Sequence, residues 1–214
     1  MRRTLLTGAL VGAVFATGAA AHDGVNHATD AEAAAHRQGA APNAAAFSPS
    51  DLPLPFLIRP EFALIDHTGR AVTQADFAGR PMAIFFGYAN CEAICSVALP
   101  AMASALDILG ADADRIAPIL ITVDPQRDTP QAMAQRLSGY HPRLIGLTGS
   151  EDALADARAV FQIDAKQVTE TADGAPVYAH GSFIYLVGAD GEVKTFMPPI
   201  LSPERIAELM RKYL

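Results

Sequence analysis

The sequence has little of what marks several large classes of protein. It carries 16 Lys and Arg against 23 Asp and Glu and shows no basic run, so its net charge of -7 is opposite in sign to that of a nucleic-acid-binding protein. It has only two cysteines in 214 residues, which excludes a scaffold built on several disulfides. We find no internal repeat. Half of the residues are hydrophobic, which is enough apolar material for one packed domain.

The first 21 residues have the pattern of a secretory signal peptide. Arg2 and Arg3 precede an apolar stretch that ends in the small residues Ala19, Ala20 and Ala21. This pattern predicts cleavage after Ala21 and a soluble protein in the periplasm of a Gram-negative bacterium. A membrane anchor is the alternative, because a signal and an anchor differ mainly in length and flanking residues. The paired arginines leave twin-arginine export open.

Residues 22–46 are dominated by Ala, Asp, Asn and Gly and have no sustained apolar period, so we expect a flexible tether. The tether contains His22, His27 and His36, and exposed imidazoles can bind a transition metal loosely. Their spacings of 5 and 9 residues match no compact metal motif. We therefore favour a plain linker.

Residues 47–214 have the pattern of an α/β domain. Strands alternate with helices, which predicts a central mixed sheet with helices on both faces. An N-terminal hairpin with Gly69 in its turn opens the domain, and a second hairpin and a helix capped by Ser202 close it. The predicted strands are 62–65, 71–73, 82–88, 116–123, 144–147, 183–187 and 192–196, and the predicted helices begin near residues 99, 129, 150 and 202.

The two cysteines carry the chemical signal. Cys91 and Cys95 follow an apolar strand and lie at the start of the next helix. A spacing of four is about one helical turn, which puts the two side chains on one face with Cβ atoms about 5–6 Å apart. Two thiolates at this separation can hold one soft ion, and the pair can also close to a disulfide. A purely structural disulfide is the alternative, but closing so short a loop stabilises a chain little.

A cuprous ion held by two thiolates needs a third donor, and three histidines of the domain are candidates. His67 lies in the turn of the first hairpin and His141 precedes a proline, so we expect both to be exposed. His180 stands just before the strand 183–187, at the rim of the sheet, where its side chain can reach into a site. We take His180 as the candidate.

Five segments together resemble one family. They are FALIDHTGRAVTQADFAGRP, FFGYANCEAIC, ITVDPQRDTP, RLIGLTGS and AHGSFIYLVGADGEV, in family order over about residues 62–193. The chain resembles the SCO (SenC/PrrC) family of exported, thioredoxin-like copper proteins. The resemblance implies a thioredoxin-like fold and a copper site made by Cys91, Cys95 and His180. The copper would be Cu(I), with Cu(II) as an alternative.

The resemblance also draws attention to Asp124, which matches the aspartate of the family's DP motif. In the family this aspartate lies close to the metal loop. We favour a different role here, in which Asp124 shapes the turn at the entry to a helix and Arg127 pairs with an acid.

The chain departs from the family pattern beside each ligand. Glu92 and Ser96 stand where prolines usually follow the cysteines, and Ala179 stands where an aspartate usually precedes the histidine. Gly181 replaces a small hydroxyl residue. Losing prolines loosens a loop, and losing the acid removes an orienting partner for the imidazole. All three ligands remain, so the sequence supports copper binding more strongly than delivery to a particular client.

Two functions of different classes follow from these residues. The first is a copper metallochaperone, not an enzyme, that delivers copper to a copper enzyme such as a cytochrome oxidase subunit, as the resemblance implies. The second is a thiol:disulfide oxidoreductase, with Cys91 and Cys95 as the redox pair, acting on the cysteines of such a client. A Cys-x-x-Cys pair would have favoured the redox role, and the longer spacing does not. A peroxidase ranks third, since no threonine positions Cys91. We expect no nucleic-acid partner, and membrane contact only if the signal stays uncleaved.

Overall fold

The computed structural model describes residues 21–22, 25–26, 57–89 and 95–214, with the backbone alone for residues 21–22 and 25–26 and for Cys95. The chain divides into two units, residues 1–47 and 48–214, which are described separately. In the first unit Ala21–His22 (β1) pairs antiparallel with Val25–Asn26 (β2), where the sequence predicted no strand. The predicted signal peptide and most of the predicted tether lie outside the described residues.

A seven-stranded mixed sheet forms the centre of the second unit, with strand order β11-β10-β5-β6-β7-β3-β4. β5, β6 and β7 run parallel, and every other neighbouring pair is antiparallel. The sheet is therefore the mixed sheet that the sequence predicted. The strands are β3 (Ala63–Asp66), β4 (Ala71–Thr73), β5 (Met82–Gly87), β6 (Ala117–Thr122), β7 (Ile145–Thr148), β10 (Ile184–Val187) and β11 (Val193–Met197).

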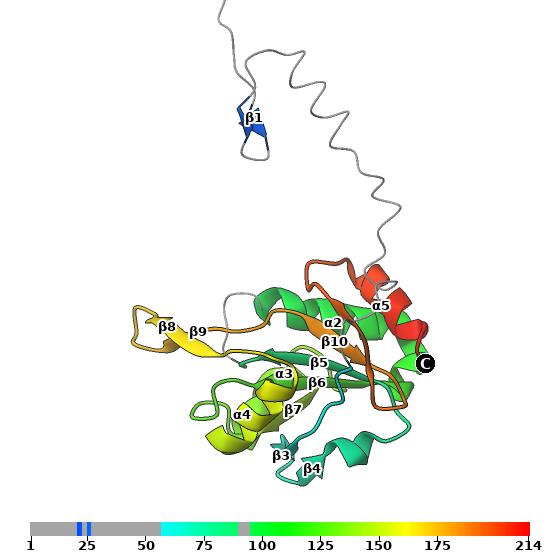
Figure 1. Ribbon diagram of the computed structural model, residues 1–214, viewed down its shortest axis with the longest axis horizontal. Coiled ribbons are helices and arrows are strands. Elements are labelled where there is room, and N and C mark those ends of the chain that lie inside the picture. Colours follow the sequence, from blue (N-terminus) through cyan, green and yellow to red (C-terminus); the bar gives the residue numbers. More distant parts are fainter. Residues whose placement is uncertain (1–20, 23–24, 27–56, 90–94) are drawn as a thin grey trace, which may run out of the picture. The chain divides into compact units, whose positions relative to one another are not determined.

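Helices cover both faces of this sheet. The α-helices are α2 (Cys95–Leu109), α3 (Pro130–Ser138), α4 (Glu151–Val160) and α5 (Pro203–Arg211), and two short 3-10 helices are η2 (Gln74–Phe77) and η3 (Gly110–Arg115). Figure 1 shows α2 and α5 on one side of the sheet and α3 and α4 on the other. The helices α3, α4 and α5 begin at hydroxyl caps, because the side chains of Thr129, Ser150 and Ser202 each accept a hydrogen bond from a backbone N–H of the first turn.

The helix α2 differs from its prediction at its start. It begins at Cys95, four residues before the predicted start at Leu99, so Pro100 lies inside the helix rather than in its first turn. A proline removes one helical hydrogen bond, which makes the turn before it hard to assign from sequence. By length and composition α2 with η3 could cross a membrane, the only such helix in the described part of the chain, but half of this stretch is buried inside the domain. Leu99, Met102 and Leu106 belong to the core, so α2 is a core helix.

One hairpin of the second unit was not predicted. The strands β8 (Lys166–Glu170) and β9 (Pro176–Ala179) pair only with each other and form a separate two-stranded sheet. Every residue of β8 is exposed, so the segment lacks the apolar alternation by which a strand is recognised in a sequence. The hairpin extends from the body of the domain in Figure 1, and β9 leads directly to His180.

Candidate functional site

Three loops meet at one edge of the sheet. β5 and β6 run parallel, so Tyr88 and Val123, which follow these strands, lie at the same edge. β10 runs antiparallel to β5, with Ile184 opposite Phe85, so the residues before β10 also lie at this edge. The topology therefore gathers the segment before the cysteines, the segment after β6 and the segment of His180.

His180 lies at this edge with its imidazole between aromatic rings. Its ring is edge-on to Phe85, with centroids 6.1 Å apart, and to Tyr88, with centroids 6.0 Å apart. Its Nδ1 lies 2.9 Å from the carbonyl oxygen of Gly181. A carbonyl oxygen only accepts, so we assign the proton to Nδ1, which leaves the lone pair on Nε2. The fold thus prepares Nε2 as the donor atom for a metal.

The backbone of Gly181 supplies the acceptor that an acidic neighbour would otherwise give. Ala179 precedes the histidine and is exposed. A Cβ at Gly181 would lie 3.2 Å from Cγ1 of Ile163, so this part of the chain packs closely over that side chain. The imidazole therefore keeps an orienting partner although the acid is absent.

The predicted thiolate ligands are the part of the site that stays a prediction. Cys91 lies outside the described residues, and of Cys95 only the backbone, as the first residue of α2, is described. Among the described side chains no three His, Cys, Asp or Glu residues come together as a metal site. Of the three predicted ligands, only the side chain of His180 is placed.

Asp124 and Arg127, which follow β6, form an ion pair in which the carboxylate is buried and the guanidinium is partly exposed. The side chain of Asp124 is only 1% exposed, and its Oδ2 accepts a hydrogen bond from Nε of Arg127. The predicted pairing of Arg127 with an acid is confirmed. The guanidinium makes two further contacts that the sequence did not indicate. Its Nη2 donates to the carbonyl oxygen of Pro176 at 2.9 Å, and its Cζ lies 5.6 Å from the centroid of the Tyr88 ring.

Tyr178 extends the aromatic contacts of this cluster. Its ring centroid lies 5.6 Å from that of Tyr88, in an edge-to-face arrangement. Burial and the negative charge of Asp124 raise the pKa of the Tyr178 phenol above its ordinary value. The phenol is therefore neutral at physiological pH.

Asp128 is a second buried acid that sequence reasoning missed. Its Oδ2 accepts hydrogen bonds from the Ala89 backbone N–H at 2.8 Å and from the Thr122 hydroxyl at 2.6 Å. Burial raises its pKa above the ordinary value in spite of these bonds. Nε of Arg136 donates to the Ala89 carbonyl oxygen at 3.0 Å. Both backbone polar groups of Ala89, two residues before Cys91, are therefore fixed by side chains.

The other two histidines of the domain do not have the exposure that the sequence predicted. The side chain of His141 is only 10% exposed, with Nε2 3.5 Å from Oδ1 of Asp107, and its Nδ1 accepts from the Arg143 backbone N–H. His67 is half-buried, and its Nδ1 accepts from the Gly146 backbone N–H at 3.1 Å. The prediction of exposure was wrong for both, because each imidazole ties a turn to its surroundings.

A surface cavity of about 490 Å³ does not coincide with this site. Its lining includes Arg59, Arg80 and Met82. Met82 is the first residue of β5, so the cavity lies at the amino end of that strand, whereas His180 lies near its carboxyl end. This cavity therefore does not mark the position of His180.

Comparison with known proteins decides the family. Residues 51–214 match the family model described as SCO1/SenC. The chain belongs to the SCO1/SenC family. Over 156 residues it is 36% identical to "Protein SCO2 homolog, mitochondrial" of Danio rerio, covering 72% of this chain and 56% of that protein. It therefore spans less than two thirds of that relative's length.

Solved structures of SCO proteins have the same fold. The chain is similar to Bradyrhizobium japonicum ScoI with copper bound, at 37% identity and a TM-score of 0.68, covering 73% of this chain and 99% of that one. It is also similar to Arabidopsis thaliana ScoI with copper bound, at 27% identity and a TM-score of 0.68, covering 73% and 97%. The predicted thioredoxin-like α/β fold is confirmed.

Proposed function

We propose that the protein is an exported copper carrier that holds copper through Cys91, Cys95 and His180 and delivers it for assembly of a copper enzyme such as cytochrome c oxidase. The observation that carries the proposal is the position of His180. Its Nε2 lone pair is prepared by the bond from Nδ1 to Gly181, at the sheet edge from which the chain continues to the cysteines. The copper-bound relatives support copper as the cargo.

The proposed donors suit copper in its reduced state. Two thiolates and one neutral imidazole make a soft site of low coordination number, which Cu(I) prefers, whereas an ion that needs six oxygen ligands would find too few here. The buried rings of Phe85 and Tyr88 flank the imidazole and limit the access of water to it. The site is thus suited to hold copper and to keep it from exchanging freely with the solvent.

Copper binding would compete with disulfide formation. The thiolate is the metal ligand, and an oxidised Cys91–Cys95 pair would offer none. Only the reduced protein can therefore load copper. This links the cargo to the redox state of the compartment.

A thiol:disulfide oxidoreductase is the second candidate function. Cys95 is the first residue of α2 and Cys91 stands four residues before it in the sequence, and a helix N-terminus favours the thiolate that disulfide exchange needs. The reduction would pass two electrons from the thiols of Cys91 and Cys95 to a client disulfide, leaving a disulfide here and two thiols on the client. This function has no need of His180, which separates it from copper carriage.

A copper titration of the reduced protein tests the proposal. The wild type should bind one Cu(I) per chain in competition with a chromophoric chelator. His180→Ala should bind more weakly, and the Cys91→Ser, Cys95→Ser double variant should lose the high-affinity site. His141→Ala, which alters an imidazole in another part of the fold, is the matched control and should bind as the wild type does.

Two results would contradict the carrier proposal. The first is a reduced wild type that fails to hold copper against a modest chelator. The second is a His180→Ala variant that reduces a client disulfide as fast as the wild type while copper binding is weak in both. The oxidoreductase would then take the place of the carrier.

We also propose that the mature protein begins at His22 and works in the periplasm. The support is the apolar stretch after Arg2 and Arg3, which ends in Ala19 to Ala21. N-terminal sequencing of the protein recovered from the periplasmic fraction should read from His22. Intact Met1 in the membrane fraction would establish the anchor instead.

A further inference from the structure

Neither strand of the hairpin that leads to His180 pairs with a described strand of the main sheet. β8 and β9 form their own two-stranded sheet, and β9 ends at Ala179, directly before His180. The position of β9 relative to the main sheet therefore depends on side-chain contacts. A ligand at the end of such a strand needs something that fixes the strand.

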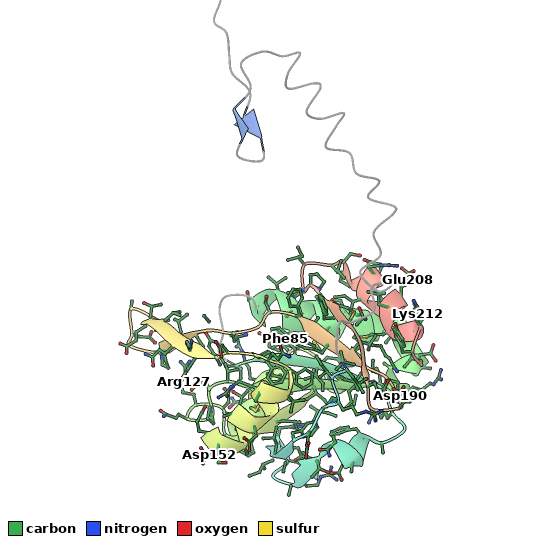
Figure 2. The ribbon with its side chains drawn as sticks, viewed as in Figure 1. Phe85, Arg127, Asp152, Asp190, Glu208 and Lys212 are labelled. Carbon is green, nitrogen blue, oxygen red and sulfur yellow. The ribbon has the colours of Figure 1, made fainter. Side chains whose placement is uncertain are left out.

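Arg127 makes a polar contact that helps to fix β9. Its Nη2 donates to the carbonyl oxygen of Pro176, the first residue of β9, at 2.9 Å. Its Nε is held by Asp124, which is fully buried after β6. Because one planar guanidinium makes both bonds, the end of β6 and the start of β9 are held at a set separation. Figure 2 shows Arg127 beside the base of the hairpin.

Arg127 also reaches His180 by a second route. Its guanidinium lies over the Tyr88 ring, and that ring in turn contacts the imidazole of His180 edge-on. Tyr88 is only 4% exposed, so the ring has little freedom to move away. The imidazole is thus constrained through the backbone of β9 and through an aromatic ring, and both constraints start at one side chain.

The same loop fixes the chain before the cysteines. Asp128 and Arg136 hold the N–H and the carbonyl oxygen of Ala89. The residues Asp124, Arg127, Asp128 and Arg136, which follow β6, therefore contact both segments that lead to predicted ligands. We call these four residues the brace.

We propose that the brace sets the position of His180 relative to Ala89, from which the chain continues towards the cysteines, with Arg127 as the positioning residue of His180. The proposal rests on the copper-binding function proposed above. In this role Arg127 acts through its contacts with Pro176 and Tyr88. A positive charge alone cannot do this. A lysine has a single side-chain nitrogen, which cannot occupy the positions of both Nε and Nη2.

The variant Arg127→Lys tests this geometry while it keeps the charge opposite Asp124. In the copper-free protein, NMR of the three domain histidines should show the His180 ring resonances displaced and those of His67 and His141 unchanged. Arg143→Lys, which alters an ion pair with Asp114 elsewhere on the surface, is the matched control and should displace none of the His180 signals. This measurement requires no copper and stands if copper carriage fails.

Copper affinity then shows whether Arg127 acts through His180. Residues that orient a metal ligand typically contribute about 10–100-fold to metal affinity. As a single substitution, Arg127→Lys should therefore weaken Cu(I) binding by about 10-fold. In the His180→Ala background the same change should have less than about a twofold effect, because the ligand that it positions is gone. X-ray absorption of the Cu(I)-loaded Arg127→Lys protein should keep two sulfur scatterers and lose imidazole scattering.

The outcomes separate the two proposals. Equal losses of affinity in both backgrounds, or equal displacement of all three histidine signals, would mean that Arg127 only supports the fold and would overturn the positioning role. A wild type that holds no copper would overturn the carrier function, and the NMR result alone would then decide the positioning role.

Discussion

The Asp66 carboxylate shows how a single buried charge is stabilised by its own turn. Its Oδ1 accepts bonds from the Thr68 and Arg70 backbone N–H groups and from the Thr68 hydroxyl, and its Oδ2 accepts from Nε of Arg70. Burial raises the pKa of Asp66, but these bonds outweigh it and lower the pKa from 3.8 to about 2. The folded protein therefore favours the ionised form.

Asp66→Asn should destabilise the protein at neutral pH. A pKa lowered from 3.8 to about 2 corresponds to about 2 kcal/mol of stability at pH 7. Because the folded pKa is the lower one, this stability is present above pH 3.8 and is lost as the pH falls towards 2. Urea unfolding across this range should show the difference between wild type and variant shrinking with pH. A constant difference would refute the account, and Asp164→Asn at an exposed site should change little.

The contacts of some side chains could be predicted from the sequence, and those of others could not. The pairing of Arg127 with an acid was predictable, because Asp124 stands three positions before it in the sequence, across one turn. The contacts of His141 and His67 were not, since their partners Asp107 and Gly146 are distant in the sequence. Asp128 lies within ITVDPQRDTP, but its bond to Ala89 spans 39 residues and needs the fold to be seen.

At the scale of elements, α3 packs on β7 over a glycine. A Cβ at Gly146 would lie 2.8 Å from Cδ1 of Leu137 and from Cε of Met133, and both of these side chains are buried. The close approach of helix and strand at this point therefore depends on the absence of a side chain.

Gly146→Ala should destabilise the protein by about 1–3 kcal/mol, because the added methyl group must displace packed side chains. Denaturant unfolding with an unchanged m-value measures the loss. Gly139→Ala, at the end of α3, is the matched control: a Cβ there meets only the Arg136 carbonyl oxygen, at 3.4 Å, so the change should stay within about 0.5 kcal/mol. Equal effects at both positions would rule out the packing argument.

Elements with a buried face were predictable, and the exposed hairpin was not. β5 and β6 are buried at every residue and read as continuous apolar runs, which is the pattern of central parallel strands. β8 has no buried residue, so hydrophobic periodicity carries no information about it. The missed hairpin is nevertheless the element that leads to His180, so the sequence analysis proposed His180 as a ligand without showing what supports it.

At the scale of the whole molecule, a buried sheet positions one edge at which the functional segments meet. The strand order places β10 beside β5 and β5 beside β6, and the loops of these three strands bring His180, Tyr88 and Asp124 together. The sequence predicted the sheet but not the strand order. The juxtaposition of Arg127 with Pro176 therefore had to come from the structure.

Transfer to a client tests the central claim, copper carriage, most directly. The Cu(I)-loaded protein would be mixed with the copper-free domain that bears the binuclear copper site of cytochrome oxidase, presented once with reduced cysteines and once as the disulfide. After separation, the copper and the free thiols of each partner are counted. A carrier should give its copper to the reduced client alone and keep both of its own thiols reduced. Transfer of no copper, with two thiols gained by the oxidised client at the expense of Cys91 and Cys95, would contradict copper carriage.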